Sequence, residues 1–132
     1  MAPIVCLDFD GVIHSYTSKW QGPRTIPDPP VPDAFCAILR YLAAGFDVVV
    51  HSSRSHAMGG RWAMARWMKR HAGPALWYDS PLGPGLERVR FVKYKPPALV
   101  TIDDRAITFQ GVWSSEWLKP EALKDFRPWN KR

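Results

Sequence analysis

The stretch Ile4-Val5-Cys6-Leu7-Asp8-Phe9-Asp10-Gly11 begins with a short apolar run and ends on two acids and a glycine. An apolar run of this length, bounded by a turn signal, is typical of a strand buried on both faces of a parallel sheet. Because strand side chains alternate, we expect Phe9 to point away from Asp8 and Asp10, whose carboxylates then converge on one pocket. Gly11 allows the backbone to turn sharply after them.

Further strands and helices alternate along the chain. Residues 12–32 are rich in turn formers and predict an irregular flap. Apolar residues at helical spacing then predict a helix from about Pro32-Asp33 to Gly45, and a second buried strand runs from Phe46 to Ser52. Leu99 to Ile102 is a later strand, and it too ends in acids, Asp103-Asp104.

Four other segments carry weaker signals. They predict a helix with its apolar face on Met58, Trp62, Ala65, Met68 and Ala72, a strand at 76–78, a strand at 108–113, and a short helix from Pro120. The basic residues of the first of these helices lie largely around its other side, namely Arg61, Arg66, Lys69 and Arg70.

This order of elements predicts an α/β fold over residues 1–132 as a single domain. We expect a three-layer, Rossmann-like arrangement with a mainly parallel central sheet and right-handed crossovers. In such sheets the ligand lies beyond the carboxyl ends of the strands. Those ends carry Asp8, Asp10, Ser52, Asp103 and Asp104.

Composition limits the class of protein. No apolar run approaches the ~20 residues that span a bilayer, and the amino terminus lacks a signal-peptide layout, so we expect a cytoplasmic protein without a membrane partner. The two cysteines, Cys6 and Cys36, lie in apolar segments and are expected in the core. The net charge of +6 and the 7 tryptophans suit either a polyanion binder or an ordinary basic bias.

The acids at the strand ends suit phosphoryl chemistry. Carboxylates held close together repel one another unless a cation is present, and Mg²⁺ takes oxygen ligands and also neutralises phosphate. With Asp103 or Asp104 arriving from another strand, the site can hold Mg²⁺ and leave one carboxylate free to attack phosphorus. A second acid must protonate the leaving oxygen and then activate water, and Asp8 and Asp10 can divide this work.

A hydroxyl and a cation should complete such a site. Ser52 is placed to bind phosphate oxygens, and Lys95, or alternatively Lys93, is the expected cation. Each of these residues also has a structural explanation, since an Asp can form a turn, Ser52 can cap a helix and a lysine can be solvated. Their occurrence together, in order along the chain and at the ends of predicted strands, favours the catalytic interpretation.

These motifs resemble those of the haloacid dehalogenase superfamily of phosphatases, whose first motif is an apolar strand ending in Asp-x-Asp-Gly. Ser52 corresponds to the second motif, Lys95 to the third, and Ile102-Asp103-Asp104-Arg105 to the acidic fourth. The resemblance implies that Asp8 is the nucleophile, that Asp10 is the acid/base residue, and that Mg²⁺ is held by Asp8, the Asp10 backbone carbonyl and Asp103, beside Asp104. The lysine departs from the commoner pattern because it lies close before Asp103.

Neither gap between the motifs is long enough for a folded cap domain, so the chain resembles the small, capless phage and bacterial members. A substrate would then meet the flap and a basic rim. We expect substrate contacts from Tyr16, Lys19, Trp20 and Arg24 of the flap and from Arg54, His56 and Arg105. The alternative is that the flap aromatics pack back on the domain and that these cations form structural ion pairs.

The sequence therefore predicts a magnesium-dependent phosphatase whose substrate is a phosphorylated small molecule, such as a nucleotide, or the terminal phosphate of a nucleic acid. One alternative is a nucleic-acid-binding or regulatory module on the same fold without turnover. Another is phosphoryl transfer to an acceptor other than water.

Overall fold

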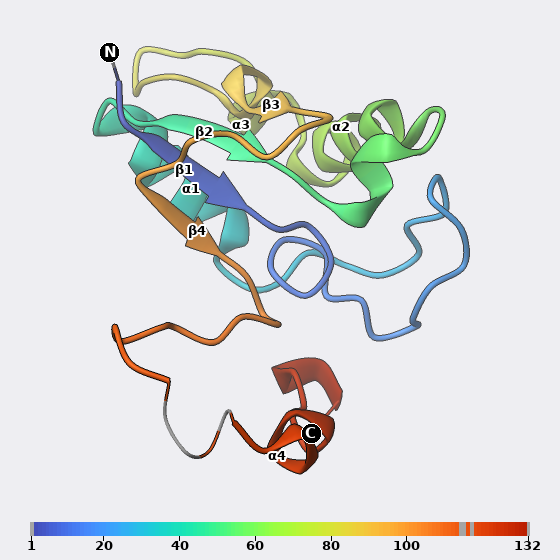
Figure 1. The fold of residues 1–132 in the computed structure, drawn as a ribbon. Coiled ribbons are helices and arrows are strands. Elements are labelled where there is room, and N and C mark those ends of the chain that lie inside the picture. The colour runs from blue at the N-terminus through green and yellow to red at the C-terminus, as the bar shows by residue number, and fades with distance from the viewer. Residues whose placement is uncertain (1, 114–115, 117, 132) are drawn as a thin grey trace.

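A computed structural model describes residues 2–113, 116 and 118–131 (Figure 1). The described part contains a parallel sheet of four strands in the order β3-β2-β1-β4. The strands are β1 (Ile4–Leu7), β2 (Asp47–Val50), β3 (Arg90–Phe91) and β4 (Val100–Ile102). The helices are α1 (Ala34–Ala43), α2 (Gly60–Ala72), α3 (Pro74–Trp77) and α4 (Pro120–Lys124), with single 3₁₀ turns at Ser53–His56, Leu86–Arg88 and Trp129–Lys131.

The register brings the carboxyl ends of the strands to one edge. Leu7 at the end of β1 is paired with Val50 of β2 and with Ile102 of β4. Backbone hydrogen bonds continue the ladders beyond the strand ends, from Asp8 N–H to the Ile102 carbonyl and from His51 N–H to the Leu7 carbonyl. The residues that follow each strand therefore meet at this edge, as the sequence predicts.

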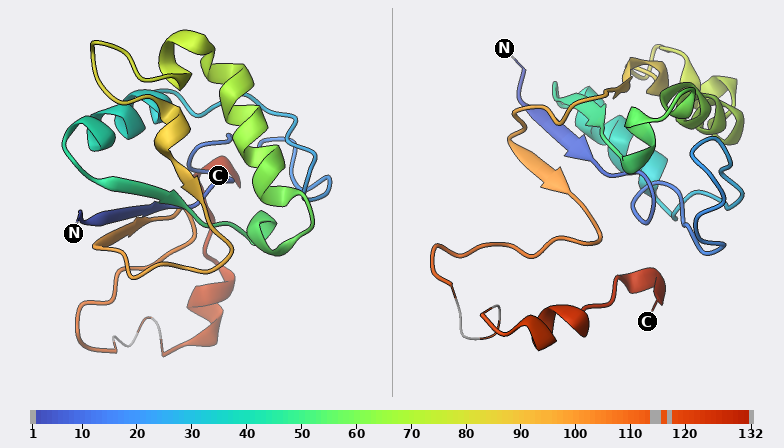
Figure 2. Two further views of the ribbon diagram at one scale, coloured as in Figure 1. Left: turned by 90° about the horizontal axis from the view of Figure 1, so that it is seen from above. Right: turned by 45° about the vertical axis from the view of Figure 1, so that its right-hand side comes forward.

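One face of the sheet carries the hydrophobic core. Val5 and Leu7 alternate with Cys6 along β1, and both pack into a cluster that includes Ile38 of α1 and Met64 of α2. The two helices therefore lie on the same face (Figure 2). Right-handed crossovers require this arrangement, because β1 to β2 and β2 to β3 step in the same direction across the sheet.

Within the part of the chain that the structure describes, no helical layer covers the opposite face, where the sequence predicts one. The return from β3 to β4 runs through residues 92–99, which form no helix and cross this face as an extended segment (Figure 2). A crossover with its own helix needs a dozen or more residues, and this connection is shorter. The α/β class and the parallel sheet are confirmed, whereas the expected three layers reduce to a sheet, one layer of helices and a covering segment.

The face that α2 presents to the core matches the predicted one only in its C-terminal half. Met68 is buried and Ala72 packs against the core as predicted, but Met58 precedes the helix and is 90% exposed, Trp62 is 61% exposed, and Met64 and Trp67 are buried instead. At the start of the helix, a Cβ at Gly60 would lie 1.9 Å from the Arg54 carbonyl oxygen, so the first turn packs directly on the preceding backbone.

Two predicted strands are wrong. Residues 76–78 overlap helix α3 instead, because Pro74 suits the first turn of a helix and fixes its start. Residues 108–113 form no strand, since the chain leaves the sheet after the Asp103-Asp104 turn and Gly111 adopts φ +94°. Cys6 is buried as expected, but Cys36 is exposed on α1, so that prediction is also wrong.

No helix in the described residues is both long enough and apolar enough to cross a membrane.

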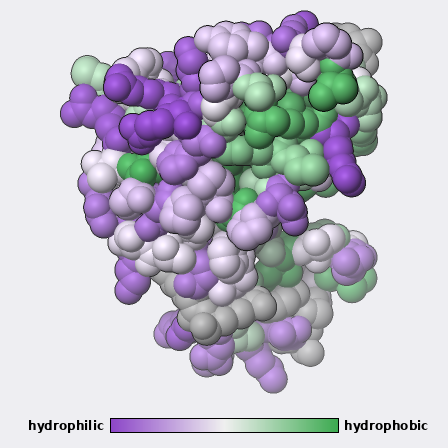
Figure 3. All heavy atoms as spheres, turned by 180° about the vertical axis from the view of Figure 1, so that it is seen from behind, coloured by the Kyte–Doolittle hydropathy of each residue, from purple (hydrophilic) through white to green (hydrophobic). Residues whose placement is uncertain are grey.

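Viewed from behind the sheet, hydrophobic residues gather over the region of α1, while the side formed by α2 is mostly hydrophilic (Figure 3).

Candidate active site

Three acids from two neighbouring strand ends come together. Asp8 follows β1, and Asp103 and Asp104 follow β4, with one carboxylate oxygen of each lying within 4.8 Å of the others. They lie at a cavity of about 430 Å³ at the carboxyl edge of the sheet. Its wall is formed by Asp8, Asp10, Tyr16, His51, Ser52, Ser53, Asp103 and Arg105.

Gly11 allows Asp104 to reach this cluster. Gly11 has φ +84°, and a Cβ there would lie 2.1 Å from Asp104 Oδ2. Asp104 Oδ1 is buried and has no hydrogen-bond partner in the described residues. A buried carboxylate oxygen without a donor, beside two further acids, fits a hard cation with oxygen ligands such as Mg²⁺. Asp8, Asp103 and Asp104 are the residues that could hold it.

Electrostatics in the metal-free site oppose ionisation. Burial, with smaller contributions from Asp103, Asp104 and Asp10, raises the pKa of Asp8 to about 7, although the Phe9 N–H that donates to Asp8 Oδ1 at 2.8 Å acts the other way. Burial and the neighbouring Asp103 also raise the pKa of Asp104. Burial, and to a smaller extent mutual repulsion, therefore disfavours the ionised site at neutral pH, and a cation would offset both effects.

In metal-free protein we expect the free energy of unfolding to fall as the pH rises from about 4 to about 7. The unfolded chain releases the Asp8 proton near its ordinary pKa of 3.8, while the folded protein retains it up to about 7, so the folded state binds more protons across this window. The loss is at most about 4 kcal/mol, which hydration of the site reduces. Mg²⁺ should restore stability, and do so more at pH 8 than at pH 5.

Urea denaturation at pH 5 and pH 8, in EDTA and in Mg²⁺, measures this effect as the difference between wild type and Asp8→Asn. Burial lowers the pKa values of His51 and His71, whose contributions have the opposite sign but cancel in that difference. Equal pH dependence in the two proteins would contradict a buried, cation-dependent Asp8.

Asp10 is held by two donors away from the other acids. Its Oδ1 accepts from His14 Nδ1 at 2.8 Å, and its carboxylate accepts from Arg54 Nε at 2.9 and 3.2 Å. The Asp28 N–H donates to His14 Nε2 at 3.0 Å, so Nε2 is unprotonated and the ring proton lies on Nδ1, facing Asp10. The Asp10 side chain is therefore not in the three-acid cluster, although it lines the same cavity.

Arg54 is buried instead of lying on the expected rim. It is 0% exposed, and its Nη1 donates to the carbonyls of Gly22, Pro23 and Thr25 at 2.9 to 3.1 Å. The guanidinium also lies 4.8 Å from the Trp20 ring. Arg54 thus joins Asp10 to the flap, which is the structural ion pair that the sequence left as the alternative to a substrate contact.

Ser52 has the predicted position and a structural task as well. It is buried beside β2, lines the cavity and caps the Ser53–His56 turn, its Oγ accepting from the Arg54 N–H at 3.2 Å. A hydroxyl whose oxygen accepts one hydrogen bond can still donate its hydrogen, so the Ser52 hydroxyl can donate to a phosphate oxygen. Ser53, which the sequence reasoning did not single out, also lines the cavity.

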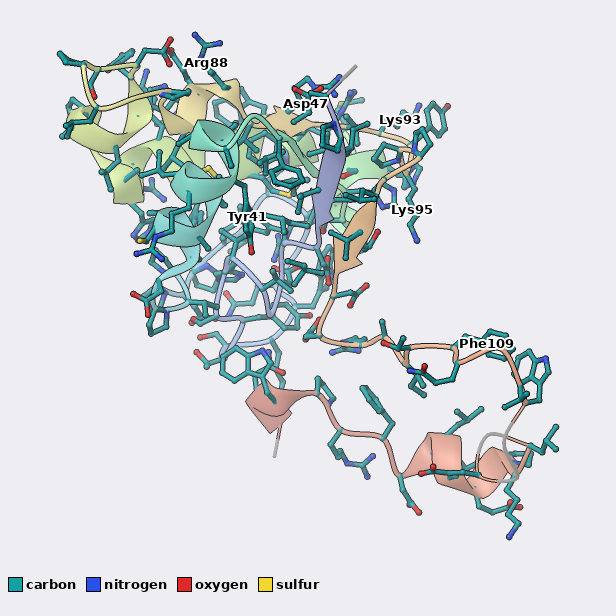
Figure 4. All side chains as sticks on the ribbon, turned by 90° about the vertical axis from the view of Figure 1, so that its left-hand side faces the viewer. Tyr41, Asp47, Arg88, Lys93, Lys95 and Phe109 are labelled. Atoms are coloured by element: carbon teal, nitrogen blue, oxygen red, sulfur yellow. The ribbon has the colours of Figure 1, made fainter. Side chains whose placement is uncertain are left out.

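Arg105, and neither Lys93 nor Lys95, is the cation among the described residues of the cavity wall. Lys93 and Lys95 lie on the exposed outer side of the 92–99 segment (Figure 4). Lys95 is near enough to His51 to contribute to its lowered pKa, after burial and His56. The sequence reasoning ranked Lys95 first because it matches the third motif, whereas Arg105 directly follows the acidic turn.

The flap is folded against the domain. Trp67 Nε1 donates to the Asp28 carbonyl at 3.2 Å, and Ser18 donates to the Asp28 carboxylate through N–H and hydroxyl. Burial alone would raise the pKa of Asp28, but these Ser18 bonds hold it below its ordinary value. Tyr16 reaches the cavity wall, and burial and Asp10 raise its pKa.

The other flap candidates lie outside the cavity wall. Lys19 is exposed at φ 65°, and Trp20 packs on Arg54 while remaining 48% exposed. Arg24 is exposed and lies beside Gly59, at the entry to α2. His56 is exposed and its ring contacts those of His51 and Tyr94.

The C-terminal segment contacts the loop that carries the first acids, which the sequence gave no signal to expect. Trp129 Nε1 donates to the Gly11 carbonyl at 2.6 Å, and Asn130 Nδ2 donates to the Ser15 carbonyl at 3.2 Å. These bonds hold the backbone immediately after Asp10 from outside the sheet.

Comparison with protein-family models, curated proteins and solved structures finds no match for this chain.

Proposed function

We propose that the protein is a magnesium-dependent phosphomonoesterase of the haloacid dehalogenase type that forms an aspartyl phosphate on Asp8. The observation that carries this proposal is the meeting of Asp8, Asp103 and Asp104 at the carboxyl edge of a parallel sheet. The second motif acid, Asp10, lines the same cavity but is held by its own donors. Such a separation of two carboxylates favours different tasks for them.

Asp8 and Asp10 act in two steps. In the first, a substrate that carries a proton on its phosphate binds, a carboxylate oxygen of Asp8 attacks phosphorus, the bond from phosphorus to the alcohol oxygen breaks, and Asp10 passes that proton to the alcohol oxygen. In the second, water attacks the same phosphorus, the bond to Asp8 breaks, and Asp10 takes a proton from the water and passes it to the released phosphate. Both acids return to their starting states, and one alcohol and one inorganic phosphate are released.

The remaining residues bind the phosphate and balance its charge. The Ser52 hydroxyl and the Arg105 guanidinium lie on the cavity wall, where each can donate to phosphate oxygens. Magnesium held by Asp8, Asp103 and Asp104 would neutralise a phosphate that these carboxylates otherwise repel. Arg105 takes the place that the sequence assigns to Lys95.

A nucleotide or the terminal phosphate of a nucleic acid is the proposed substrate. Without the four acids of the site, the rest of the chain has 8 acidic and 18 basic residues and therefore a formal net charge of +10. That charge draws polyanions toward the molecule while the acidic cavity receives a terminal phosphate. Tyr16 on the cavity wall offers a ring against a base or sugar.

Phosphate release from a generic aryl phosphate tests the proposal. We expect release in Mg²⁺ that stops when EDTA is added. Release unaffected by EDTA, or none with any divalent cation, would contradict it. Phosphorylated product other than free phosphate would favour transfer to another acceptor, and a screen of nucleotides and of 3′- or 5′-phosphorylated oligonucleotides would then identify the substrate.

A further inference from the structure

A second concave surface lies away from the acids. The groove between α2 and α3 has a volume of about 730 Å³, compared with about 430 Å³ for the acidic cavity, and the two have no lining residue in common. Its wall includes Trp62, Arg66, Lys69, Arg70, Trp77 and Tyr78, and none of its described lining residues is an acid.

The positive charge of this groove follows from the sequence around it. Residues 48–78 contain no Asp or Glu and five Arg or Lys. Four of the five are on α2, and the nearest acids along the chain, Asp47 and Asp79, both lie outside this helix. The hydrophilic side of the molecule formed by α2 is visible from behind (Figure 3). A concave, single-sign surface concentrates counter-ions such as phosphates.

Aromatic rings are paired with these cations. The Arg66 guanidinium lies 5.1 Å from the centre of the Trp62 ring, and Lys69 Nζ lies 5.7 Å from the centre of the Tyr78 ring. Trp62 is 61% exposed and Tyr78 is 48% exposed, so neither ring is needed to fill the core. Exposed rings beside cations are the combination that stacks bases and pairs phosphates in single-strand binders.

The groove continues toward the flap. A smaller hollow of about 150 Å³ shares Trp62, Arg66 and Arg70 with it and adds Arg24 of the flap. The basic surface thus crosses α2 as a track and is not a single isolated pocket. A track of this kind suits an extended chain with regularly spaced charges better than a compact anion.

We propose that the α2–α3 groove binds single-stranded nucleic acid, with bases stacked on Trp62 and Tyr78 and phosphates paired with Arg66, Lys69 and Arg70. This site is separate from the acidic cavity, and it stands whether or not the protein is a phosphatase.

Fluorescence anisotropy with an oligodeoxythymidine of 15 nucleotides tests the site. The probe carries hydroxyl groups at both ends and its fluorophore on an internal base, so that the acidic cavity has no terminal phosphate to bind. We expect log K to fall with log salt with a slope of about −2, as three phosphate contacts to single strands predict. The Asp8→Asn variant should bind equally well.

The double variant Trp62→Ala/Arg66→Ala should weaken binding about tenfold to a hundredfold and reduce the salt slope by about 0.7. The matched control is Trp113→Ala/Lys119→Ala, which removes an exposed ring and one positive charge from the C-terminal segment and should change binding less than twofold. If circular dichroism shows that the first variant is not folded, Lys69→Ala/Arg70→Ala tests the same groove through its charges.

Three results would overturn the proposal. The first is equal weakening by the groove variant and by its control. The second is undiminished binding of an abasic oligonucleotide of the same length, which would mean that the rings do not stack bases. The third is tighter binding to vesicles of phosphatidylserine than to the oligonucleotide, which would assign the surface to a membrane. Aryl phosphate hydrolysis by the groove variant, expected unchanged, reports on the acidic cavity separately.

Discussion

Asp8→Asn should lower the rate of phosphate release by about 10⁴-fold or more, as removal of a covalent nucleophile does in other enzymes. The asparagine amide does not attack phosphorus, yet it has nearly the same shape as the carboxylate. Its Oδ1 can still accept the Phe9 N–H, which donates to Asp8 at 2.8 Å. The protein should therefore remain folded. It should also be more stable than wild type in EDTA at pH 8, because it no longer has to bury an ionised carboxylate, the burial that raises the Asp8 pKa.

Two further variants make this result specific. Asp79→Asn removes an exposed carboxylate that pairs with Arg88 on the surface, and its rate should stay within twofold of wild type. Asp103→Asn removes a proposed metal ligand, and its rate should recover partly as Mg²⁺ is raised. A rate in Asp8→Asn above about one tenth of wild type would place the nucleophile elsewhere.

Arg54→Met should lower the free energy of unfolding by about 3–5 kcal/mol, the usual cost of removing one partner of a buried ion pair. Arg54 is 0% exposed, its Nε lies 2.9 Å from Asp10 Oδ2, and its Nη1 donates to three flap carbonyls. Methionine fills part of the space but leaves Asp10 and the carbonyls without this donor. The flap should also become sensitive to proteases, since the three hydrogen bonds from Arg54 to its carbonyls are lost.

Arg88→Met is the matched control because Arg88, like Arg54, pairs with an aspartate through Nε. That pair is exposed, at 58% for Arg88 and 41% for Asp79, so its loss should cost about 0–1 kcal/mol. Urea denaturation measures both variants. Equal losses in the two would mean that burial of Arg54 contributes nothing to the flap.

The ends of β1 and β4 could be predicted from the sequence because the signals that mark them lie within a few neighbouring residues. The apolar runs before Asp8 and before Asp103 each predict a buried strand, and parallel strands bring their carboxyl ends to one edge. The structure confirms both strands and places Asp8 and Asp103 together. Whether these acids attack phosphorus stays a prediction.

Contacts set by packing could not be predicted. At the start of α2, Gly60 lies against the Arg54 carbonyl, a close approach that no helical periodicity encodes. Strand β3 has only two residues and carries no alternation to detect. Arginine is almost never fully buried unless paired, so the sequence placed Arg54 on the rim, and nothing marked His14 as the donor to Asp10.

Assembly of the acidic cavity depends on contacts between distant parts of the chain. Its first acids come from β1, its last from β4, and the Gly11 carbonyl receives a hydrogen bond from Trp129 across 118 residues. Contacts between residues so far apart in the sequence form slowly, because the intervening loops must close first. A chain that has packed only α1 and α2 would hold Asp8 without Asp103 and Asp104, so the proposed metal site would be complete only once β4 has joined the sheet.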